Sequence, residues 1–109
     1  MDYKTITLSI ENKIAVLTLN APDVLNALSG PMVEEISAAL TAVGKPDSGV
    51  RCLVMTGAGR AFCAGANLQA RPAAGAPVPA GHILETHYAP VLNKIRLLPL
   101  PFVSAVNGP

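Results

Sequence analysis

The segment from Val50 to Leu68 reads Val-Arg-Cys-Leu-Val-Met-Thr-Gly-Ala-Gly-Arg-Ala-Phe-Cys-Ala-Gly-Ala-Asn-Leu, and it decides the fold. Its first part, Val50 to Met55, is apolar on both faces, which is typical of an interior strand covered on two sides. The strand leaves through Thr56-Gly57-Ala58-Gly59, and small residues recur at Ala64-Gly65-Ala66. Small side chains at a strand exit let a ligand approach the backbone closely. Peptide N–H groups held there are good stabilisers of a developing oxyanion.

The residues before this segment predict a hairpin and a helix. Thr5 to Ile10 and Ile14 to Leu19 are β-branched, partly alternating runs, which indicate two antiparallel strands joined by residues 11–13. Pro22 prevents the second strand from continuing, so residues 20–26 are expected to form a loop. Ser29 can cap a helix that ends at Gly44 and Pro46. The apolar stripe of that helix, at helical spacing, consists of Met32, Val33, Ile36, Leu40 and Val43.

The residues after the segment predict a loop, a helix and a last strand. Gln69 to Gly81 is rich in Ala, Pro and Gly without periodicity, and we expect a mobile loop. A second helix is expected over Ile83 to Leu98, kinked or split at Pro90. Phe102 to Val106 is expected to be another buried strand. The core face of the second helix is expected to contain Val91, Leu92, Ile95 and Leu98.

The predicted order is β-β-α-β-loop-α-β, and parallel strands with helical crossovers indicate an α/β layered fold. A chain of 109 residues with 50% hydrophobic and 14% charged residues suits at most one domain with buried parallel strands. A formal net charge of +1 without a basic run argues against nucleic acid or an anionic membrane as partners.

The N-terminus and the cysteines favour the cytoplasm as the default compartment. Met1-Asp-Tyr-Lys4 lacks the basic region and the long apolar core of a signal peptide, and no apolar stretch is long enough to span a membrane. Cys52 and Cys63 show no metal-binding spacing. We interpret Cys52, in the middle of the predicted strand, as a buried reduced thiol.

Three motifs, taken together and in this order, resemble the crotonase superfamily, which is also called the enoyl-CoA hydratase/isomerase family. Ala61 to Leu68 matches the family element A-F-x-A-G-A-[DN]-[LI] position by position. Ala21 to Leu28 is similar to R-P-x-x-x-N-A-L, with Ala21 where Arg is common. Leu100 to Pro109 is similar to the strand K-P-x-[IV]-A-A-[VI]-N-G.

The resemblance implies that residues 1–109 are the N-terminal part of a crotonase-like domain, a spiral of ββα units. Members of that family are much longer and continue with a glycine-rich turn and a helix that carries catalytic residues. We therefore expect this chain to be a fragment. The longer protein is expected to form a homo-oligomer, either a trimer or a hexamer, as its relatives do.

The resemblance also assigns roles to individual residues. It implies that the backbone N–H of Ala66 is the first oxyanion-hole donor, whereas the residues alone allow a plain turn of small side chains. Asn67 stands where Asp is commoner, and either a cap or a ligand contact remains open. Asn26 fits a loop or cap position, and Ala21 removes the charge that Arg would offer a phosphate. The implied coenzyme A contacts are Asp23, Val24, Leu25, Ala64, Gly65, Asn67 and Leu68.

Other kinds of site are disfavoured by spacing. His82 and His87 have no Cys, Asp or second His at ligand spacing, so no metal site is expected. Gly57 and Gly59 do not begin a dinucleotide fingerprint, because Phe62 stands where a third glycine is needed. Tyr88 and Ile83 correspond to positions that wall the acyl pocket in relatives, although simple packing or surface placement is equally compatible.

Two classes of function follow. The first is an acyl-CoA enzyme that adds water across a 2-enoyl-CoA or, as the near alternative, moves the double bond, including in ring-containing acyl-CoAs. Coenzyme A would then belong to the substrate, with no permanent cofactor. The second is a non-catalytic truncated paralogue or oligomer-binding piece. The DNA that follows the Pro109 codon would distinguish the two classes.

We expect the 109 residues alone to be inactive, because no glutamate occupies the family's catalytic positions. The glutamates in question are Glu11, Glu34, Glu35 and Glu85.

Overall fold

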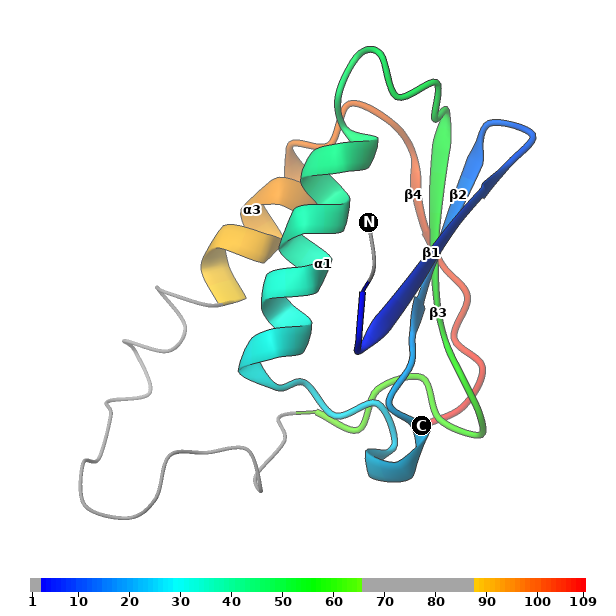
Figure 1. Ribbon diagram of the computed structural model, residues 1–109, viewed down its shortest axis with the longest axis vertical. Coiled ribbons are helices and arrows are strands. Elements are labelled where there is room, and N and C mark those ends of the chain that lie inside the picture. The colour runs from blue at the N-terminus through cyan, green and yellow to red at the C-terminus, as the bar shows by residue number, and fades with distance from the viewer. Residues whose placement is uncertain (1–2, 66–87) are drawn as a thin grey trace.

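The computed structural model describes residues 3–65 and 88–109, which form one layer of sheet and one layer of helices (Figure 1). Predicted features at residues 66–87 lie outside the described residues. They include Ala66 to Leu68, the loop 69–81, both histidines and Ile83. The described elements are β1 (Ile6–Glu11), β2 (Ile14–Leu19), η1 (Pro22–Val24), α1 (Gly30–Val43), β3 (Cys52–Gly57), α3 (Ala89–Arg96) and β4 (Phe102–Ser104).

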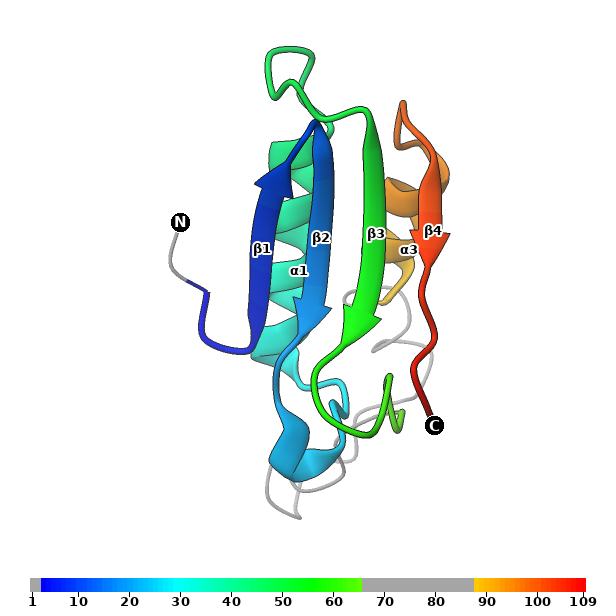
Figure 2. The ribbon, with the colours of Figure 1, turned by 90° about the vertical axis from the view of Figure 1, so that its right-hand side faces the viewer.

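The strands form a single sheet in the order β1-β2-β3-β4 (Figure 2). β1 pairs with β2 antiparallel, whereas β2 with β3 and β3 with β4 are parallel. The predicted hairpin and the α/β order of elements are therefore confirmed. Because β2, β3 and β4 run in one direction, their carboxyl ends meet at the same edge of the sheet.

Helix α1 begins and ends where the sequence predicts. The Ser29 Oγ accepts a hydrogen bond from the Met32 N–H at 3.3 Å, and the Gly44 N–H donates to the Leu40 carbonyl at 3.0 Å. Every member of its predicted apolar stripe is buried. The helix lies on one face of the sheet beside α3 (Figures 1 and 2).

The core lies between α1 and the sheet. Alternate residues of the strands point toward the helix, because side chains alternate across a strand. The register pairs Ala15 with Leu53 and Leu17 with Met55, so these side chains share the covered face. Burying one aliphatic side chain contributes about 1.5–3 kcal/mol. The fully buried strand residues are Ile6, Ala15, Leu17, Leu19 and Leu53.

Two predictions about burial in the sheet are wrong. The strand predicted from Val50 begins at Cys52, and Cys52 is a half-buried first residue rather than a buried one in mid-strand. β4 covers only Phe102 to Ser104, and its Val103 is 48% exposed. The cause is the same in both cases, since the described helices cover one face of the sheet and β4 is an edge strand.

Helix α3 departs from its predicted core face at one position. Val91, Ile95 and Leu98 are half-buried against the core, as predicted, but Leu92 is 56% exposed. Pro90 lies in the first turn of α3, and the part of the predicted helix before Tyr88 lies outside the described residues. None of the helices in the described part of the chain is long and apolar enough to cross a bilayer.

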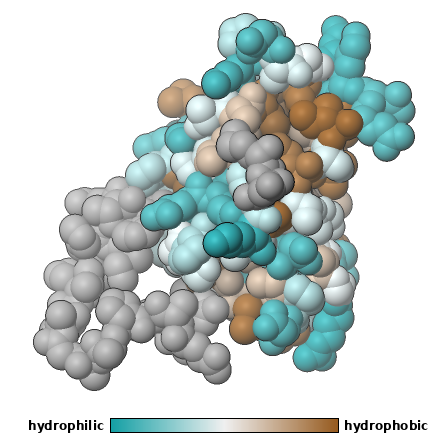
Figure 3. All heavy atoms as spheres, in the orientation of Figure 1, coloured by the Kyte–Doolittle hydropathy of each residue, from teal (hydrophilic) through white to brown (hydrophobic). Residues whose placement is uncertain are grey.

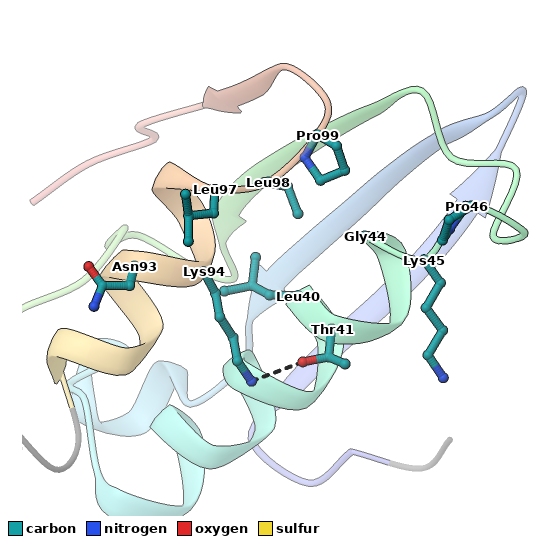
Figure 4. A pocket seen from close by; sticks show the side chains of 10 residues that line it. All are labelled: Leu40, Thr41, Gly44, Lys45, Pro46, Asn93, Lys94, Leu97, Leu98 and Pro99. Carbon is teal, nitrogen blue, oxygen red and sulfur yellow. Dashed lines mark hydrogen bonds between the residues drawn. The ribbon is translucent and has the colours of Figure 1, made fainter.

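A groove of about 430 Å³ separates the C-terminal parts of α1 and α3 (Figure 4). Lys94 reaches across it, and its Nζ donates to the Ser37 Oγ at 2.6 Å and to the Thr41 Oγ1 at 2.9 Å. These bonds tie α3 to α1, so the ammonium group is occupied within the fold. Hydrophobic residues also reach the surface near the hairpin end of the sheet (Figure 3), where Ile10 and Ile14 are exposed.

Glu35 anchors the segment that leads into β1. Its carboxylate accepts hydrogen bonds from the Lys4 and Thr5 N–H groups, each at 2.7 Å, and from the Thr5 hydroxyl. Burial alone would raise the pKa of Glu35, but these hydrogen bonds and the Lys4 charge together hold that pKa below its ordinary value.

The hairpin turn offers a first test. Asn12 and Lys13 have φ of 53° and 66°, a conformation that costs an L-residue about 1–2 kcal/mol and costs glycine little. We expect Lys13→Gly to raise the free energy of unfolding by about 0.5–1 kcal/mol in urea titrations. Lys45→Gly, at an exposed lysine outside the hairpin, is the comparison and should give no gain. A lower stability of Lys13→Gly would contradict this account of the turn.

Glu35 offers a second test through pH. A carboxyl whose pKa is depressed by folding stabilises the folded state above its unfolded pKa of about 4.3, and this contribution is lost as the pH falls through the lowered value. We expect Glu35→Gln to lose about 1 kcal/mol at pH 7 and to converge with the wild type in acid. Urea titrations across pH measure this. Glu34→Gln, at the exposed neighbour, should behave as wild type throughout; a Glu35 effect independent of pH would refute the mechanism.

Candidate functional site

The candidate site lies where the carboxyl ends of β2, β3 and β4 meet. Three connections converge at this edge: residues 20–28 after β2, residues 58–65 after β3, and residues 105–109 after β4. Ligands of open parallel sheets bind outside the carboxyl ends of the strands. The groove between α1 and α3 lies at the opposite end of α1, away from these connections.

The connection after β2 contains a short helix and two residues with positive φ. Helix η1 ends at Val24 with Leu25 as its C-cap, and Leu25 and Asn26 have φ of 53° and 56°. A non-glycine residue in this region is uncommon and reflects strain that surrounding contacts must support. Here the support comes from the next connection, because the Leu25 carbonyl accepts a 3.0 Å hydrogen bond from the Ala64 N–H.

Asn26 is fully buried, and its side chain joins the first two connections. Its Oδ1 accepts from the Ala21 N–H at 2.8 Å. Its Nδ2 donates to the carbonyls of Ala58 at 3.0 Å and Ala61 at 2.9 Å. The loop position expected for Asn26 is confirmed, but the side chain caps no helix, since Ser29 performs that task for α1.

Asn107, in the third connection, also forms hydrogen bonds with the turn after β3. Its Oδ1 accepts from the Gly57 N–H at 3.1 Å, and its Nδ2 donates to the carbonyls of Gly59 at 3.1 Å and Ala61 at 3.3 Å. The sequence interpretation gave Asn107 no role. The available signal was an Asn-Gly pair directly after a strand, and Asn-Gly by itself indicates only a turn.

The turn after β3 is packed too closely for side chains at two glycines. A Cβ on Gly57 would overlap the Ala61 carbonyl oxygen and lie 2.6 Å from that of Phe62. A Cβ on Gly108 would overlap the Arg60 carbonyl oxygen. The backbone segments therefore touch directly, and the absence of side chains at these points is a steric requirement.

The backbone N–H groups of this turn are largely committed to bonds within the chain. Phe62 and Cys63 both donate to the Pro109 carbonyl, at 2.6 and 3.0 Å, and Ala64 donates to Leu25. The Gly65 carbonyl accepts from the Leu28 N–H at 2.6 Å, while the Gly65 N–H has no acceptor among the described residues. Within residues 62–65, the Gly65 N–H is therefore the one peptide donor without a partner among the described residues.

Comparison with known proteins agrees with this arrangement. Residues 9–109 match the family model described as enoyl-CoA hydratase/isomerase. The chain belongs to the enoyl-CoA hydratase/isomerase family. The resemblance seen in its three motifs is thereby confirmed.

Individual members of the family show the same relationship. Over 108 residues, 99% of this chain, it is 41% identical to a probable enoyl-CoA hydratase of Rhodobacter capsulatus and covers 40% of that protein. It is 39% identical to the 1,2-epoxyphenylacetyl-CoA isomerase of Escherichia coli, covering 91% of this chain and 38% of the relative. The chain therefore spans about 40% of the length of these curated relatives.

A solved family structure confirms the fold. The enoyl-CoA hydratase of Mycobacterium smegmatis superimposes with a TM-score of 0.83 at 29% identity, over 94% of this chain and 40% of that one. The predicted crotonase-like α/β architecture is thus confirmed for the part of the chain that the structure describes.

The structure brings together the described members of the family's expected coenzyme A surface. Asp23 is exposed and Val24 and Leu25 are half-buried in the first connection, and Ala64 and Gly65 are exposed in the second. Hydrogen bonds join the two groups, from Ala64 to Leu25 and from Leu28 to Gly65. The remaining expected coenzyme A contacts, Asn67 and Leu68, and the expected oxyanion donor, Ala66, lie outside the described residues.

Metal ligands do not gather among residues 3–65 and 88–109, where no group of three or more His, Cys, Asp or Glu side chains has suitable geometry. Cys52 and Cys63 are half-buried free thiols. The described edge offers backbone amides and carbonyls, with the exposed side chains of Asp23 and Arg60 beside them.

The tight turn generates a test of steric fit. Gly57→Ala forces the Ala61–Phe62 backbone to move, and overpacking of this kind costs about 1–3 kcal/mol. We expect a corresponding loss in the free energy of unfolding, measured with urea. Gly30→Ala is the matched control, because a Cβ at Gly30 meets no atom within 4 Å, and it should not destabilise the protein. Equal stability of the two variants would contradict the packing described for this turn.

Proposed function

We propose that this chain forms the thioester-polarising part of an enzyme that acts on acyl-CoA substrates. The observation that carries the proposal is the meeting of residues 20–28 and 58–65 at the carboxyl edge of the sheet, with the N–H groups of Phe62, Cys63 and Ala64 already bonded. Backbone donors available from Gly65 onward suit a ligand that approaches this edge with its carbonyl oxygen.

In this proposal the backbone N–H of Ala66 donates to the thioester oxygen. Adding a nucleophile across the conjugated double bond, or removing a proton beside the thioester, places negative charge on that oxygen. One preorganised donor to such a charge is worth about 3 kcal/mol. Ala66 directly follows Gly65, whose φ of 107° favours glycine and redirects the chain at this point.

The coenzyme A part of the substrate is proposed to lie along the two joined connections. The exposed backbone at Ala64 and Gly65 offers carbonyl and N–H groups, and the exposed Asp23 adds a polar side chain. Ala21 offers no positive charge, so contacts to phosphate at that position are not part of the proposal. The full proposed surface is Asp23, Val24, Leu25, Ala64, Gly65, Asn67 and Leu68.

Hydration of a 2-enoyl-CoA is the preferred reaction, and double-bond isomerisation is the second candidate. The probable hydratase of Rhodobacter capsulatus supports the first, and the Escherichia coli relative, named an isomerase, supports the second at nearly the same identity. Coenzyme A is proposed to arrive as part of the substrate rather than as a resident cofactor. The active form is proposed to be a homotrimer or a hexamer.

The test uses the product of the complete reading frame that encodes this chain. Loss of enoyl absorbance with crotonyl-CoA should show turnover on the order of 1 s⁻¹ or faster, whereas residues 1–109 alone should show none. Ala66→Pro removes the proposed donor and should lower kcat by about 10²–10³. Ala66→Gly keeps the N–H group and should lose far less.

Each other outcome has a defined meaning. Double-bond migration in place of hydration would select the isomerase. A product that neither binds coenzyme A in calorimetry nor converts enoyl or isomeric thioesters would overturn the proposal and favour a non-catalytic protein. Measurable hydration by residues 1–109 alone would mean that Glu34, Glu35 or Glu85 must be reconsidered as a catalytic group.

A further inference from the structure

We infer that Asn26 and Asn107 are positioning residues, whose side-chain amides jointly fix the turn after β3 that leads to the proposed oxyanion donor. The inference rests on the proposed function and adds to it two residues that contact no substrate. They lie 81 positions apart in sequence and converge on one atom, the carbonyl oxygen of Ala61.

The first step concerns that oxygen. It accepts hydrogen bonds from the Asn26 Nδ2 at 2.9 Å and from the Asn107 Nδ2 at 3.3 Å. A carbonyl oxygen has two lone pairs, so both are occupied by these side chains. Ala61 is itself buried, so water cannot readily replace either donor.

The bonds to the Ala61 carbonyl also constrain the residues that follow it. A peptide unit is planar, so fixing the Ala61 carbonyl also fixes the direction of the Phe62 N–H. That N–H and the next, on Cys63, both donate to the Pro109 carbonyl, and the Ala64 N–H donates to Leu25. Successive amides from 62 to 64 are thus bonded within the fold, and the next amide, that of Gly65, has no acceptor among the described residues.

The third step concerns the other contacts of the two asparagines. Asn26 also accepts from Ala21 and donates to Ala58, and Asn107 also accepts from Gly57 and donates to Gly59. Each side chain therefore bonds to backbone groups of more than one residue, with its NH₂ group as donor and its carbonyl oxygen as acceptor. A carboxylate of the same shape accepts hydrogen bonds only, and it would face the Ala61 carbonyl without a donor.

These contacts matter for the reaction because donors to an oxyanion act only at the correct position. A displacement of about 1 Å at a catalytic group can cost about 10²-fold in rate. The donors must lie about 2.7–3.1 Å from the position that the oxygen occupies when it carries the negative charge, rather than from the position of the ground-state carbonyl oxygen. A turn fixed by two amide side chains meets this demand without any conformational change when the substrate binds.

The test uses the product of the complete reading frame and two variants. Asn107→Asp keeps the acceptor to Gly57, removes both donated bonds and lies at an exposed position, so the variant should fold. Asn26→Ala removes the buried amide without burying a charge. Asn93→Asp, at an exposed asparagine on α3, is the matched control and should behave as wild type.

Three measurements are compared: amide hydrogen exchange at residues 62–65, kcat and KM with crotonyl-CoA, and the isotope-edited carbonyl stretch of a bound thioester. We expect faster exchange, a kcat lowered by about 10–100-fold with little change in KM, and a carbonyl stretch displaced toward its value in water. The last shift reports weaker polarisation of the thioester, which a purely structural role would leave unchanged.

The inference and the proposed function fail in different ways. An active wild type whose Asn107→Asp variant keeps its kcat and its bound carbonyl frequency overturns the inference alone. Faster exchange with an unchanged carbonyl frequency also overturns it, because the two amides would then serve stability only. A wild type that neither binds nor converts the thioester overturns the proposed function, and the inference with it.

Discussion

The carbonyl oxygen of Ala61 is the point on which the carboxyl edge of the sheet depends. Two amide donors reach it from loops on either side of β3, one before α1 and one after β4. A buried carbonyl left without a donor would cost about 1–3 kcal/mol, and each of the two loops supplies one donor to this one. Satisfying one backbone atom thus joins three segments that are distant in sequence.

The order of the strands makes this junction possible. β3 lies between β2 and β4 and runs parallel to both, so the chain leaves all three strands at the same edge. Helix α1 covers the sheet over β1 and β2 (Figure 2), and Leu28, which precedes the helix, donates its N–H to the Gly65 carbonyl. The packing of the core and the shape of the candidate site are therefore consequences of one topology.

Much of the fold could be predicted from the sequence because its signals are local. Ser29 and Gly44 mark the ends of α1, and the spacing of its apolar residues marks its buried face. Burial was predicted less well for β4 and for helix α3. Val103 and Leu92 are apolar yet exposed. An apolar pattern indicates that a residue favours a buried position, but it does not show which element would cover that residue.

The candidate site was only partly predictable, for a different reason. The small residues Ala64 and Gly65 indicate a backbone site, since close approach requires small side chains. Asn26 was identified as a loop residue, but the two carbonyls to which it donates lie more than 30 positions away, and no local pattern encodes them. Asn107 was overlooked because Asn-Gly is a common turn pair, and only its pairing in space with Asn26 reveals a shared task.

In the proposed function, backbone groups polarise the thioester and side chains elsewhere transfer protons. This separation explains why relatives with different reaction names share this part of the chain. Polarising a thioester is common to hydration and to double-bond migration, because both reactions place charge on the same carbonyl oxygen. A backbone donor serves either reaction and needs no particular side chain, only a fixed position. Proton-transfer groups distinguish the two reactions, and general acid–base groups depend on side-chain identity and pKa. A segment whose site consists of backbone groups is therefore suited to both reactions, and the choice between them is made by residues other than those described here.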